Sequence, residues 1–437
     1  MEIVNIRKRD GSVKAFEVKK ISNAVAKAFR ETDEGTDEDA EKVASLVHEK
    51  IILMCKAAIE ADPDSPLASK CIEGNPSVEE IQDLVEAALM EMDYFETAKA
   101  YILYRARRKR LRERDLFHKR TNLKPYEYPE LAEYVDSIRH SYWIHTEFNF
   151  TSDINDFKVN VNDAERDAIK KAMLAIAQIE VAVKTFWGDI YKKMPKPEVG
   201  AVGFTFAESE VRHMDAYSHL LEILGLNDEF KDLTKVPVIQ QRIDYLEQVI
   251  ALSRTNENRD YSLAVLLFSL FVEHVSLFSQ FLIMMSFNKH RNLFKGISNA
   301  VEATSKEEQI HGLFGIDLIN LIRKEHPEWF DDDHREHVRT MCIEAFQAES
   351  GIVDWIYEKG ELDFLSKDEV KEFIKNRLNN SLISIGIDPV FMVDEKLVEK
   401  TDWFDEEVIG TKHVDFFQKR SINYNKRQAS VTGDDLF

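Results

Sequence analysis

The chain has 437 residues, of which 44% are apolar and 31% charged, and its 58 basic and 79 acidic side chains give a net charge of −21. This excess of acid argues against a general nucleic-acid-binding protein, which needs a positive field to meet phosphates. The low content of proline (10) and glycine (15) excludes a loop-rich β-sandwich and a disordered chain. We expect a mainly α protein with two or three domains of about 150 residues each.

The chain contains three cysteines, Cys55, Cys71 and Cys342. No two of them have metal-ligand or redox spacing and their number is odd, so we expect a reducing compartment, no disulfide framework and no thiolate zinc site. The N-terminal segment MEIVNIRKRDG lacks the apolar core of a signal peptide, which predicts a cytoplasmic protein.

Residues 1–105 have the pattern of a small α/β unit. Alternating segments at 2–6 and 13–16 flank a turn signal and predict a hairpin. Three helices are then expected. The first two cover 19–30 and 40–59. The third follows a loop at 62–76 and begins with Ser77 and Glu80, which form a capping box. The basic run at 105–114 closes the unit as a solvated linker helix; a nucleic-acid contact is the weaker alternative.

From about residue 130 to 400 the apolar residues recur with a period near 3.6. The predicted helices are 163–193, 200–225, 237–254, 260–287, 290–322, 333–359 and 366–385. Helices of this length favour a bundle. The polar segment from 413 to 437 has no sustained periodicity, and we expect a mobile tail.

The segment 263–287 is long and apolar enough to cross a bilayer, but Glu273 and His274 lie near its middle. An ionisable group is costly there, so a membrane span is not expected. A carboxylate in such a helix needs a partner, which is either another protein charge or a metal ion.

Two predicted helices each contain Glu-x-x-His, formed by Glu210 with His213 and by Glu308 with His311. Residues at i and i+3 share a helix face, so each pair can present a carboxylate and an imidazole to one point. Glu180 and Glu273 lie amid apolar neighbours in two further helices. One Glu from each of two helices and Glu-x-x-His from each of two others is the ligand set of ferritin-like dinuclear proteins. This set suits iron or manganese.

A single Glu-x-x-His is common on helix surfaces, and only the combination in this order predicts a metal site. His274, His219 and Asp189 lie near the proposed ligands in the sequence. None of them completes a second set, and a structural role is expected for each.

With these motifs, residues 115–437 resemble the small, radical-generating subunit of class I ribonucleotide reductase. The resemblance implies that Tyr217, four residues after His213, is the radical tyrosine, with a core aromatic as the alternative. It also implies that Trp143 and Tyr424 relay the radical and that the C-terminal peptide, ending in Leu436 and Phe437, anchors the large subunit.

Residues 1–105 resemble an ATP-cone domain through VNIRKRDG at 4–11, FEVKKI at 16–21, VEEIQDLVE at 78–86 and AKAYILYR at 98–105. The resemblance implies that Lys8, Arg9, Lys20 and Lys99 contact the triphosphate of ATP or dATP. Solvated surface side chains are the alternative for each of them.

Three residues depart from the usual family pattern. Glu180 replaces the more common first-ligand Asp, a change associated with manganese-containing members. Glu307 replaces the Asp that bonds the relay tryptophan, and Lys184 lies one helical turn after Glu180. These departures favour manganese and weaken the assignment of a radical on Tyr217, while the dinuclear site is still expected.

The expected domains are an ATP-cone at 1–105, a ferritin-like radical-generating bundle at 106–412 and a docking tail at 413–437. The resemblance implies a homodimer that passes an oxidising equivalent to a cysteine of the large subunit for deoxyribonucleotide synthesis. By this resemblance, dATP would switch the activity off by favouring higher oligomers. Such a switch requires that the associated, inhibited state bind dATP more tightly than the free state does. A stand-alone dinuclear oxidase and a metal-storage bundle are the alternatives; neither would need Tyr424 or an ATP-cone.

Overall fold

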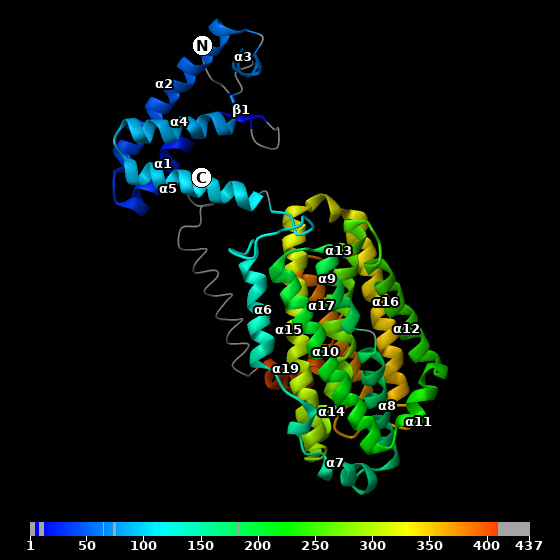
Figure 1. Cartoon of the computed structure of the whole chain (residues 1–437). Coiled ribbons are helices and arrows are strands. Elements are labelled where there is room, and N and C mark those ends of the chain that lie inside the picture. Colours follow the sequence, from blue (N-terminus) through cyan, green and yellow to red (C-terminus); the bar gives the residue numbers. More distant parts are fainter. Residues whose placement is uncertain are drawn as a thin grey trace. The chain divides into compact units, whose positions relative to one another are not determined.

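The computed structural model describes residues 5–7, 13–63, 65–72, 76–112, 114–181 and 183–409. The chain divides between residues 113 and 114 into an N-terminal unit and a helical unit. The secondary structure of both units is dominated by helices (Figure 1), which confirms the predicted fold class.

The N-terminal unit combines a two-stranded hairpin with helices. Its elements are β1 (Asn5–Arg7), β2 (Val13–Ala15), α1 (Val18–Thr32), α2 (Asp37–Ala61), α3 (Pro66–Ile72), α4 (Val78–Glu91) and α5 (Phe95–Arg112). The strands are antiparallel and pair Asn5 with Ala15, as the alternating segments predict. The capping box at the start of α4 is also confirmed, because the Ser77 backbone N–H donates to Glu80 Oε2 at 2.7 Å. Helix α3 lies inside the segment predicted as a loop.

The helices of the N-terminal unit enclose an apolar core that includes Val25, Phe29, Val47 and Leu89. A disulfide joins Cys55 of α2 to Cys71 of α3, with the two Cα atoms 5.3 Å apart. The expectation of no disulfide framework is therefore wrong for Cys55 and Cys71. Sequence spacing alone could not indicate it, because the two sulfur atoms meet only when α3 folds back on α2.

The basic run at the end of α5 is not uniformly solvated. The Arg105 side chain is only 17% exposed and pairs with Glu79 at 3.0 Å, Asp83 at 2.7 Å and Glu86 at 2.5 Å. The prediction of a solvated residue is therefore wrong for Arg105, which cross-links α5 to α4. Helix α5 also continues through the predicted boundary at 105–106, and the division into domains stays a prediction.

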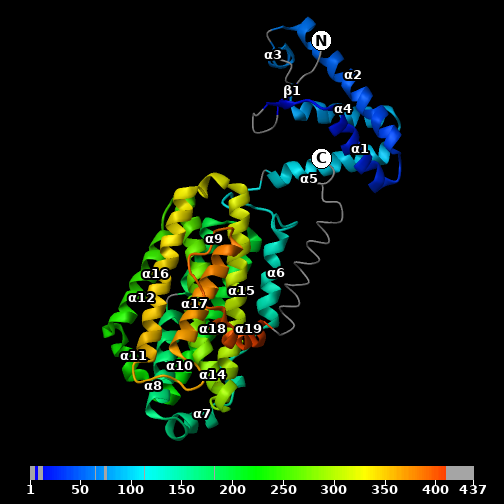
Figure 2. The ribbon, with the colours of Figure 1, turned by 180° about the vertical axis from the view of Figure 1, so that it is seen from behind.

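The helical unit is a bundle of long helices that run side by side, as Figures 1 and 2 show from opposite sides. Its α-helices are α6 (Pro129–His140), α7 (Thr151–Asn155), α8 (Asp163–Glu180), α9 (Lys184–Lys193), α10 (Pro197–Leu224), α11 (Asn227–Asp232), α12 (Pro237–Ser253), α13 (Asn258–Leu267), α14 (Phe278–Arg291), α15 (Lys295–Glu325), α16 (Asp332–Ile356), α17 (Lys367–Ser384), α18 (Glu395–Val398) and α19 (Asp402–Ile409). Two π-helical segments are η2 (Asp156–Asn160) and η4 (Phe268–Ser276). Short 3-10 turns are η1 (His145–Glu147), η3 (Leu233–Lys235), η5 (Pro327–Trp329) and η6 (Glu399–Thr401).

The helix predicted over 163–193 is interrupted after Glu180, and α9 begins at Lys184. The sequence predicts continuity because no proline or glycine lies between residues 180 and 184. The interruption directly follows a residue of the predicted metal site. Intrinsic helix propensity is a weak preference, and tertiary interactions around such a site can override it and end a helix.

The helical segment Asn258–Arg291 is long and apolar enough to span a membrane by length and composition. Within its most apolar window 89% of the residues are buried inside the bundle. The segment packs against α15 and α17. Burial against protein therefore accounts for the apolar character of this segment, and its middle is the π-helical segment η4 that carries Glu273.

Candidate metal centre

Four helical segments bring the six predicted ligands together in the interior of the bundle. Glu180 ends α8, Glu210 and His213 lie on α10, Glu273 lies in η4, and Glu308 and His311 lie on α15. Every one of the six is at most 1% exposed. The i, i+3 spacing of each Glu-x-x-His pair places both side chains on the inner face of its helix.

The six side chains form two groups of ligand atoms, and all atoms of a group lie within 4.8 Å of one another. One group contains Glu210, Glu273, Glu308 and His311, and the other contains Glu180, His213 and Glu308. Glu308 belongs to both groups. A carboxylate has two oxygens, so it can serve two neighbouring ions at once.

Both histidines turn Nδ1 towards the carboxylates. His213 Nδ1 lies 3.0 Å from Glu308 Oε1, and His311 Nδ1 lies 3.0 Å from Glu210 Oε1. Their Nε2 atoms point outward, where His213 meets Glu307 Oε2 at 2.8 Å and His311 meets Ser209 Oγ at 3.0 Å. Histidines that bind a metal typically use the second ring nitrogen in this way, since an outer partner fixes the tautomer and the ring orientation.

Burial dominates the electrostatics of the cluster. It raises the pKa of Glu180, and the neighbouring Glu210 and Glu308 carboxylates add to that shift. It also raises the pKa of Glu273, next to the same two carboxylates. Burial opposes the charged form of both histidines, but hydrogen bonds and charge from the carboxylates raise the pKa of His213 and His311. So many acids in an apolar interior need compensating positive charge.

Both carboxylate oxygens of Glu180 are buried and have no hydrogen-bond partner among the described residues. Buried carboxylate oxygens are normally satisfied, and each exception calls for an explanation such as an ion. The donor set of carboxylate and imidazole fits iron or manganese. The geometry of this chain therefore suits a dinuclear metal centre.

Two outer partners of the cluster were missed from the sequence. Trp187 is fully buried, and its Nε1–H donates to Glu273 Oε1 at 2.8 Å. Ser209 directly precedes Glu210 and contacts His311. The sequence offers a weak signal for Trp187, which lies seven residues after Glu180, but the break between α8 and α9 removes the simple helical relation.

Trp143, Glu307 and Tyr217 surround the His213 side of the cluster. The Trp143 ring is stacked on the His213 ring, with centroids 5.8 Å apart and planes at 17°. Its Nε1 has no hydrogen-bond partner among the described residues, so the Trp–Glu307 bond implied by the family resemblance is absent there. Tyr217 is 1% exposed, and burial together with the Glu180 carboxylate raises the pKa of its hydroxyl.

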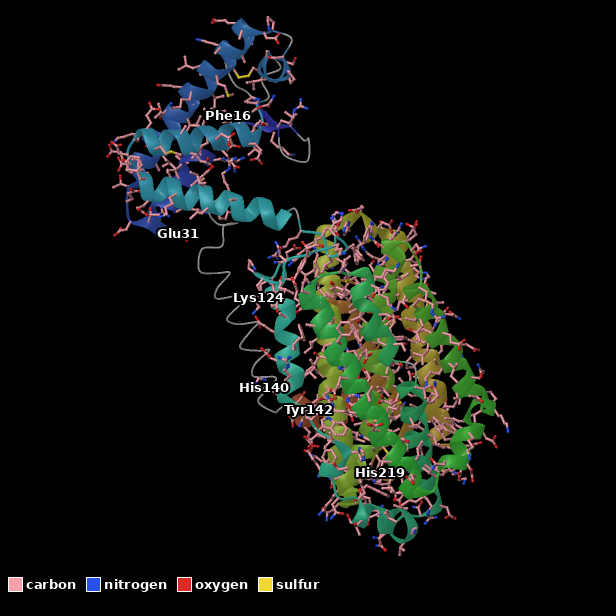
Figure 3. The ribbon with its side chains drawn as sticks, in the orientation of Figure 1. Phe16, Glu31, Lys124, His140, Tyr142 and His219 are labelled. Carbon is pink, nitrogen blue, oxygen red and sulfur yellow. A yellow bond between two sulfur atoms is a disulfide. The ribbon has the colours of Figure 1, made fainter. Side chains whose placement is uncertain are left out.

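The neighbouring residues expected to be structural lie outside the two ligand groups. His274 Nδ1 contacts Ser381 Oγ at 2.9 Å. His219, labelled in Figure 3, lies beside His145 with ring centroids 5.1 Å apart. Asp189 pairs with Lys192 at 2.7 Å on the surface. The Lys184 side chain lies outside the described part of the structure.

The predicted nucleotide contacts are only partly within the described residues. Lys20 and Lys99 are both exposed, and Lys20 pairs with Glu17 at 2.8 Å. Lys8 and Arg9 lie outside the described residues, as do Tyr424 and the predicted docking tail. The roles of all these residues stay predictions.

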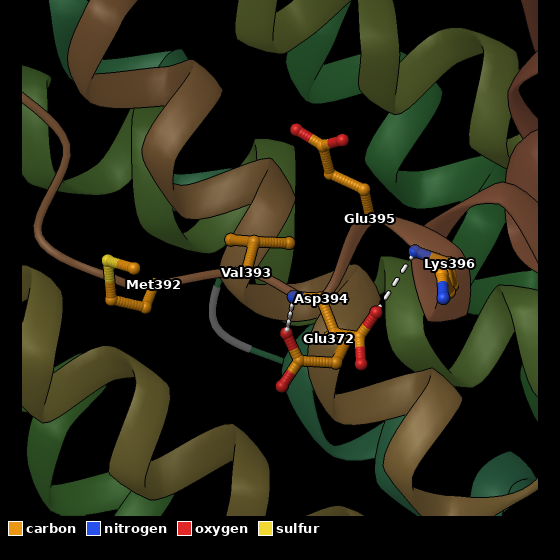
Figure 4. A pocket seen from close by; sticks show the side chains of 6 residues that line it. All are labelled: Glu372, Met392, Val393, Asp394, Glu395 and Lys396. Carbon is orange, nitrogen blue, oxygen red and sulfur yellow. Dashed lines mark hydrogen bonds between the residues drawn. The ribbon is translucent and has the colours of Figure 1, made fainter.

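A second group of metal-ligand type, Asp115, Glu325 and His326, lies half-buried elsewhere in the helical unit. Both Glu325 oxygens are occupied by protein donors, the Leu116 N–H at 2.9 Å and the Tyr128 hydroxyl at 2.6 Å. A surface pocket is lined by Glu372, Met392, Val393, Asp394, Glu395 and Lys396 (Figure 4) and includes no residue of the buried cluster.

Comparison with known families gives two matches that together span most of the chain. Residues 120–418 match the family described as "Ribonucleotide reductase, small chain", and residues 4–110 match the "ATP cone domain". Among curated relatives, the "Probable ribonucleoside-diphosphate reductase small subunit 048L" of Invertebrate iridescent virus 3 is 25% identical over 338 residues, which cover 72% of this chain and 86% of the relative. The ribonucleoside-diphosphate reductase subunit beta of Chlamydia pneumoniae is 21% identical and covers 64% and 83%.

Solved structures share the bundle. The ribonucleotide reductase R2 subunit from Clostridium botulinum has a TM-score of 0.59 and 17% identity and covers 64% of this chain and 89% of that chain. The dimanganese(II)-NrdF of Streptococcus sanguinis has a TM-score of 0.55 and 17% identity and covers 65% and 99%. At such identities the likeness establishes the fold.

Proposed function

The chain belongs to the ribonucleotide reductase small-chain family, as a ribonucleoside-diphosphate reductase small subunit with an N-terminal ATP-cone, and we propose that its buried cluster holds two metal ions. The observation that carries this proposal is the sharing of Glu308 between two groups of ligand atoms. Glu180 and His213 complete one position, and Glu210, Glu273 and His311 complete the other. Manganese is the favoured metal because Glu180 stands where family members more often have Asp.

When bound, the metal pair would supply a one-electron oxidising equivalent to the protein. Tyr217 is the side chain proposed to store it, since it is buried and the Glu180 carboxylate raises the pKa of its hydroxyl. Trp143 is the proposed next carrier, because its ring is stacked on His213. Tyr424 in the tail would pass the equivalent on to the large subunit.

The need for a large subunit as partner is inferred from the small number of cysteines in this chain. Reduction of a ribonucleotide needs a set of cysteines, but this chain has three, of which two form a disulfide and Cys342 is buried. The large subunit would supply the thiols and bind the C-terminal tail. The working small subunit would be a homodimer.

The ATP-cone is proposed to sense ATP and dATP through Lys8, Arg9, Lys20 and Lys99. A lysine or arginine supplies the charge and donors that triphosphate oxygens need. Inhibition would follow if dATP binds an associated form of the dimers more tightly than the free form.

Metal stoichiometry tests the proposed centre. Elemental analysis of the chain loaded with Mn²⁺ or Fe²⁺ should give two ions per chain, and Glu308→Gln should reduce this to fewer than one, because both positions share this residue. Glu302→Gln on the same helix, which breaks only a half-buried pair with Lys306, is the matched control and should keep two. Two ions retained in Glu308→Gln would contradict the shared site.

Coupled assays separate the proposed function from the stand-alone oxidase. The loaded chain should reduce ribonucleoside diphosphates only when the large subunit is present. Oxygen consumption with substrate turnover that is indifferent to the large subunit would favour the oxidase.

A further inference from the structure

Arg212 lies between Glu210 and His213 on α10, but its side chain points away from the ligand groups. It is only 6% exposed. Its Nη1 donates to Glu307 Oε2 at 3.2 Å and its Nη2 to Glu307 Oε1 at 3.1 Å. Nη1 also donates to the Trp143 backbone carbonyl at 3.0 Å. One guanidinium thus joins α10, α15 and the segment that carries Trp143.

Both oxygens of the Glu307 carboxylate accept hydrogen bonds from Arg212. Glu307 is completely buried, and besides the two-pronged bond from Arg212 it meets His213 Nε2 at 2.8 Å. Planar, two-pronged pairs of this kind fix orientation as well as charge. Glu307 is therefore turned towards His213 and Arg212, which explains why the Trp143 indole N–H has no described acceptor.

Trp143 is consequently held by its backbone and its ring face. Arg212 donates a hydrogen bond to the Trp143 carbonyl. The same guanidinium lies 4.5 Å from the ring centroid of Tyr142 and 5.9 Å from that of Trp143. Tyr142, labelled in Figure 3, is exposed and lies between this cation and the solvent. The Trp143 ring also lies against the Phe148 ring, with centroids 5.5 Å apart, and no described side chain bonds its indole nitrogen.

We propose that Arg212 is a positioning residue for electron transfer between Trp143 and the metal centre, acting by clamping Glu307 and the Trp143 backbone so that the indole stays stacked on His213. The inference rests on the proposed function. In the step concerned, Trp143 would give up one electron, and a bound metal pair would be the oxidant that accepts it. The indole keeps its N–H proton, since no described acceptor is bonded to it, and Trp143 is restored by one electron arriving from the Tyr424 side.

The test compares Arg212→Gln and Arg212→Lys with the control Glu208→Gln. Glu208 pairs with Arg212 from the half-exposed side at 2.9 Å, and such pairs contribute little, so the control should keep at least half of the wild-type kcat. Arg212→Gln should bind two metal ions yet lose at least tenfold in kcat for coupled nucleotide reduction, with KM for the large subunit within twofold. Lysine can replace only part of the planar fork, so Arg212→Lys should fall between.

A second readout needs neither metal nor partner. The near-ultraviolet circular dichroism of Trp143 is obtained in metal-free protein as the difference from Trp143→Phe in each background. Arg212→Gln should lose at least half of this band, whereas Glu208→Gln should keep it. If wild-type protein supports no nucleotide reduction, the proposed function fails, while this band still decides whether Arg212 positions Trp143.

Arg212→Gln leaves Glu307 buried without its cation, which can prevent folding. If Arg212→Gln does not fold, the double variant Arg212→Gln/Glu307→Gln, which removes both charges, is tested instead. The same losses of kcat and of the Trp143 band are expected for it. The proposal is overturned if the folded variant keeps the Trp143 band and a kcat within twofold of wild type, or if Glu208→Gln loses as much as Arg212→Gln.

Discussion

At the scale of single residues, the side chains of the cluster are oriented by hydrogen-bond partners that lie outside it. Glu308 serves both groups of ligand atoms, the two histidines are braced at Nε2 by Glu307 and Ser209, and Glu273 is held by Trp187. Outer partners of this kind orient metal ligands before the ion arrives. The site therefore depends on residues outside the two groups of ligand atoms.

The Trp187 contact gives a prediction. Trp187→Phe removes the N–H that bonds Glu273 but keeps an aromatic ring in the pocket, so Mn²⁺ affinity should fall by roughly 10–100-fold. Titration of the metal-free protein with Mn²⁺, followed by electron paramagnetic resonance of the free ion, measures the change. Trp403→Phe in α19 is the control and should leave the affinity unaltered. Equal affinities in all three proteins would show that the indole has no part in holding Glu273.

At the scale of elements, helix α3 shows how a segment without strong helical periodicity is fixed. The disulfide ties it to α2, and its Ala68 is fully buried. Cross-linking residues 16 apart in sequence removes conformational freedom from the unfolded chain. Part of the loop predicted at 62–76 is therefore a helix, α3 over Pro66–Ile72.

Thiol counting checks this pairing. Denatured, non-reduced protein should show one reactive thiol, that of Cys342, and three after reduction. Cys71→Ser should destabilise the N-terminal unit by about 3 kcal/mol, the value expected for a loop of this length, as measured by its thermal unfolding transition. Wild-type protein treated with reductant should behave like the variant. Three reactive thiols before reduction would rule the disulfide out.

At the scale of the whole molecule, an ATP-cone domain and a ribonucleotide reductase small chain occur in one chain. Regulation of the subunit by its own N-terminal unit requires that a nucleotide favour one assembly state over another. The long helix α5 ends at Arg112, so a cut after residue 113 removes the N-terminal unit without shortening a described helix of the bundle.

Sedimentation velocity tests this regulation. Wild-type protein should show a larger mass with dATP than with ATP, and the chain lacking residues 1–113 should show the same mass with both. The truncated chain should retain two metal ions, because all six ligands lie in the helical unit. An identical mass distribution of the wild type in ATP and dATP would contradict control through association.

Truncation at the other end tests the partner contact. Removal of residues 413–437 should abolish coupled nucleotide reduction while leaving the metal content at two ions per chain. Tyr424→Phe should keep binding to the large subunit but lose turnover, because phenylalanine has no hydroxyl proton to exchange and is much harder to oxidise. Nucleotide reduction retained by the truncated chain would show that the tail is not the docking segment.

The sequence by itself determined the helical class, the hairpin, the capping box at Ser77 and the six residues of the cluster. These are local features: helical periodicity, cap chemistry and the i, i+3 spacing need only neighbours along the chain. Even the burial of Glu273 follows from the apolar run that surrounds it.

Only the tertiary structure decided which atoms meet. The interruption after Glu180, the π-helical segment around Glu273, the Cys55–Cys71 disulfide and the contacts of Trp187 and Arg212 all depend on packing between segments far apart in sequence. Local propensity is worth less than 1 kcal/mol per residue for ordinary side chains, whereas an unpaired buried charge costs several. Packing between distant segments, together with the compensation of buried charge at the cluster, therefore set the details that periodicity left open.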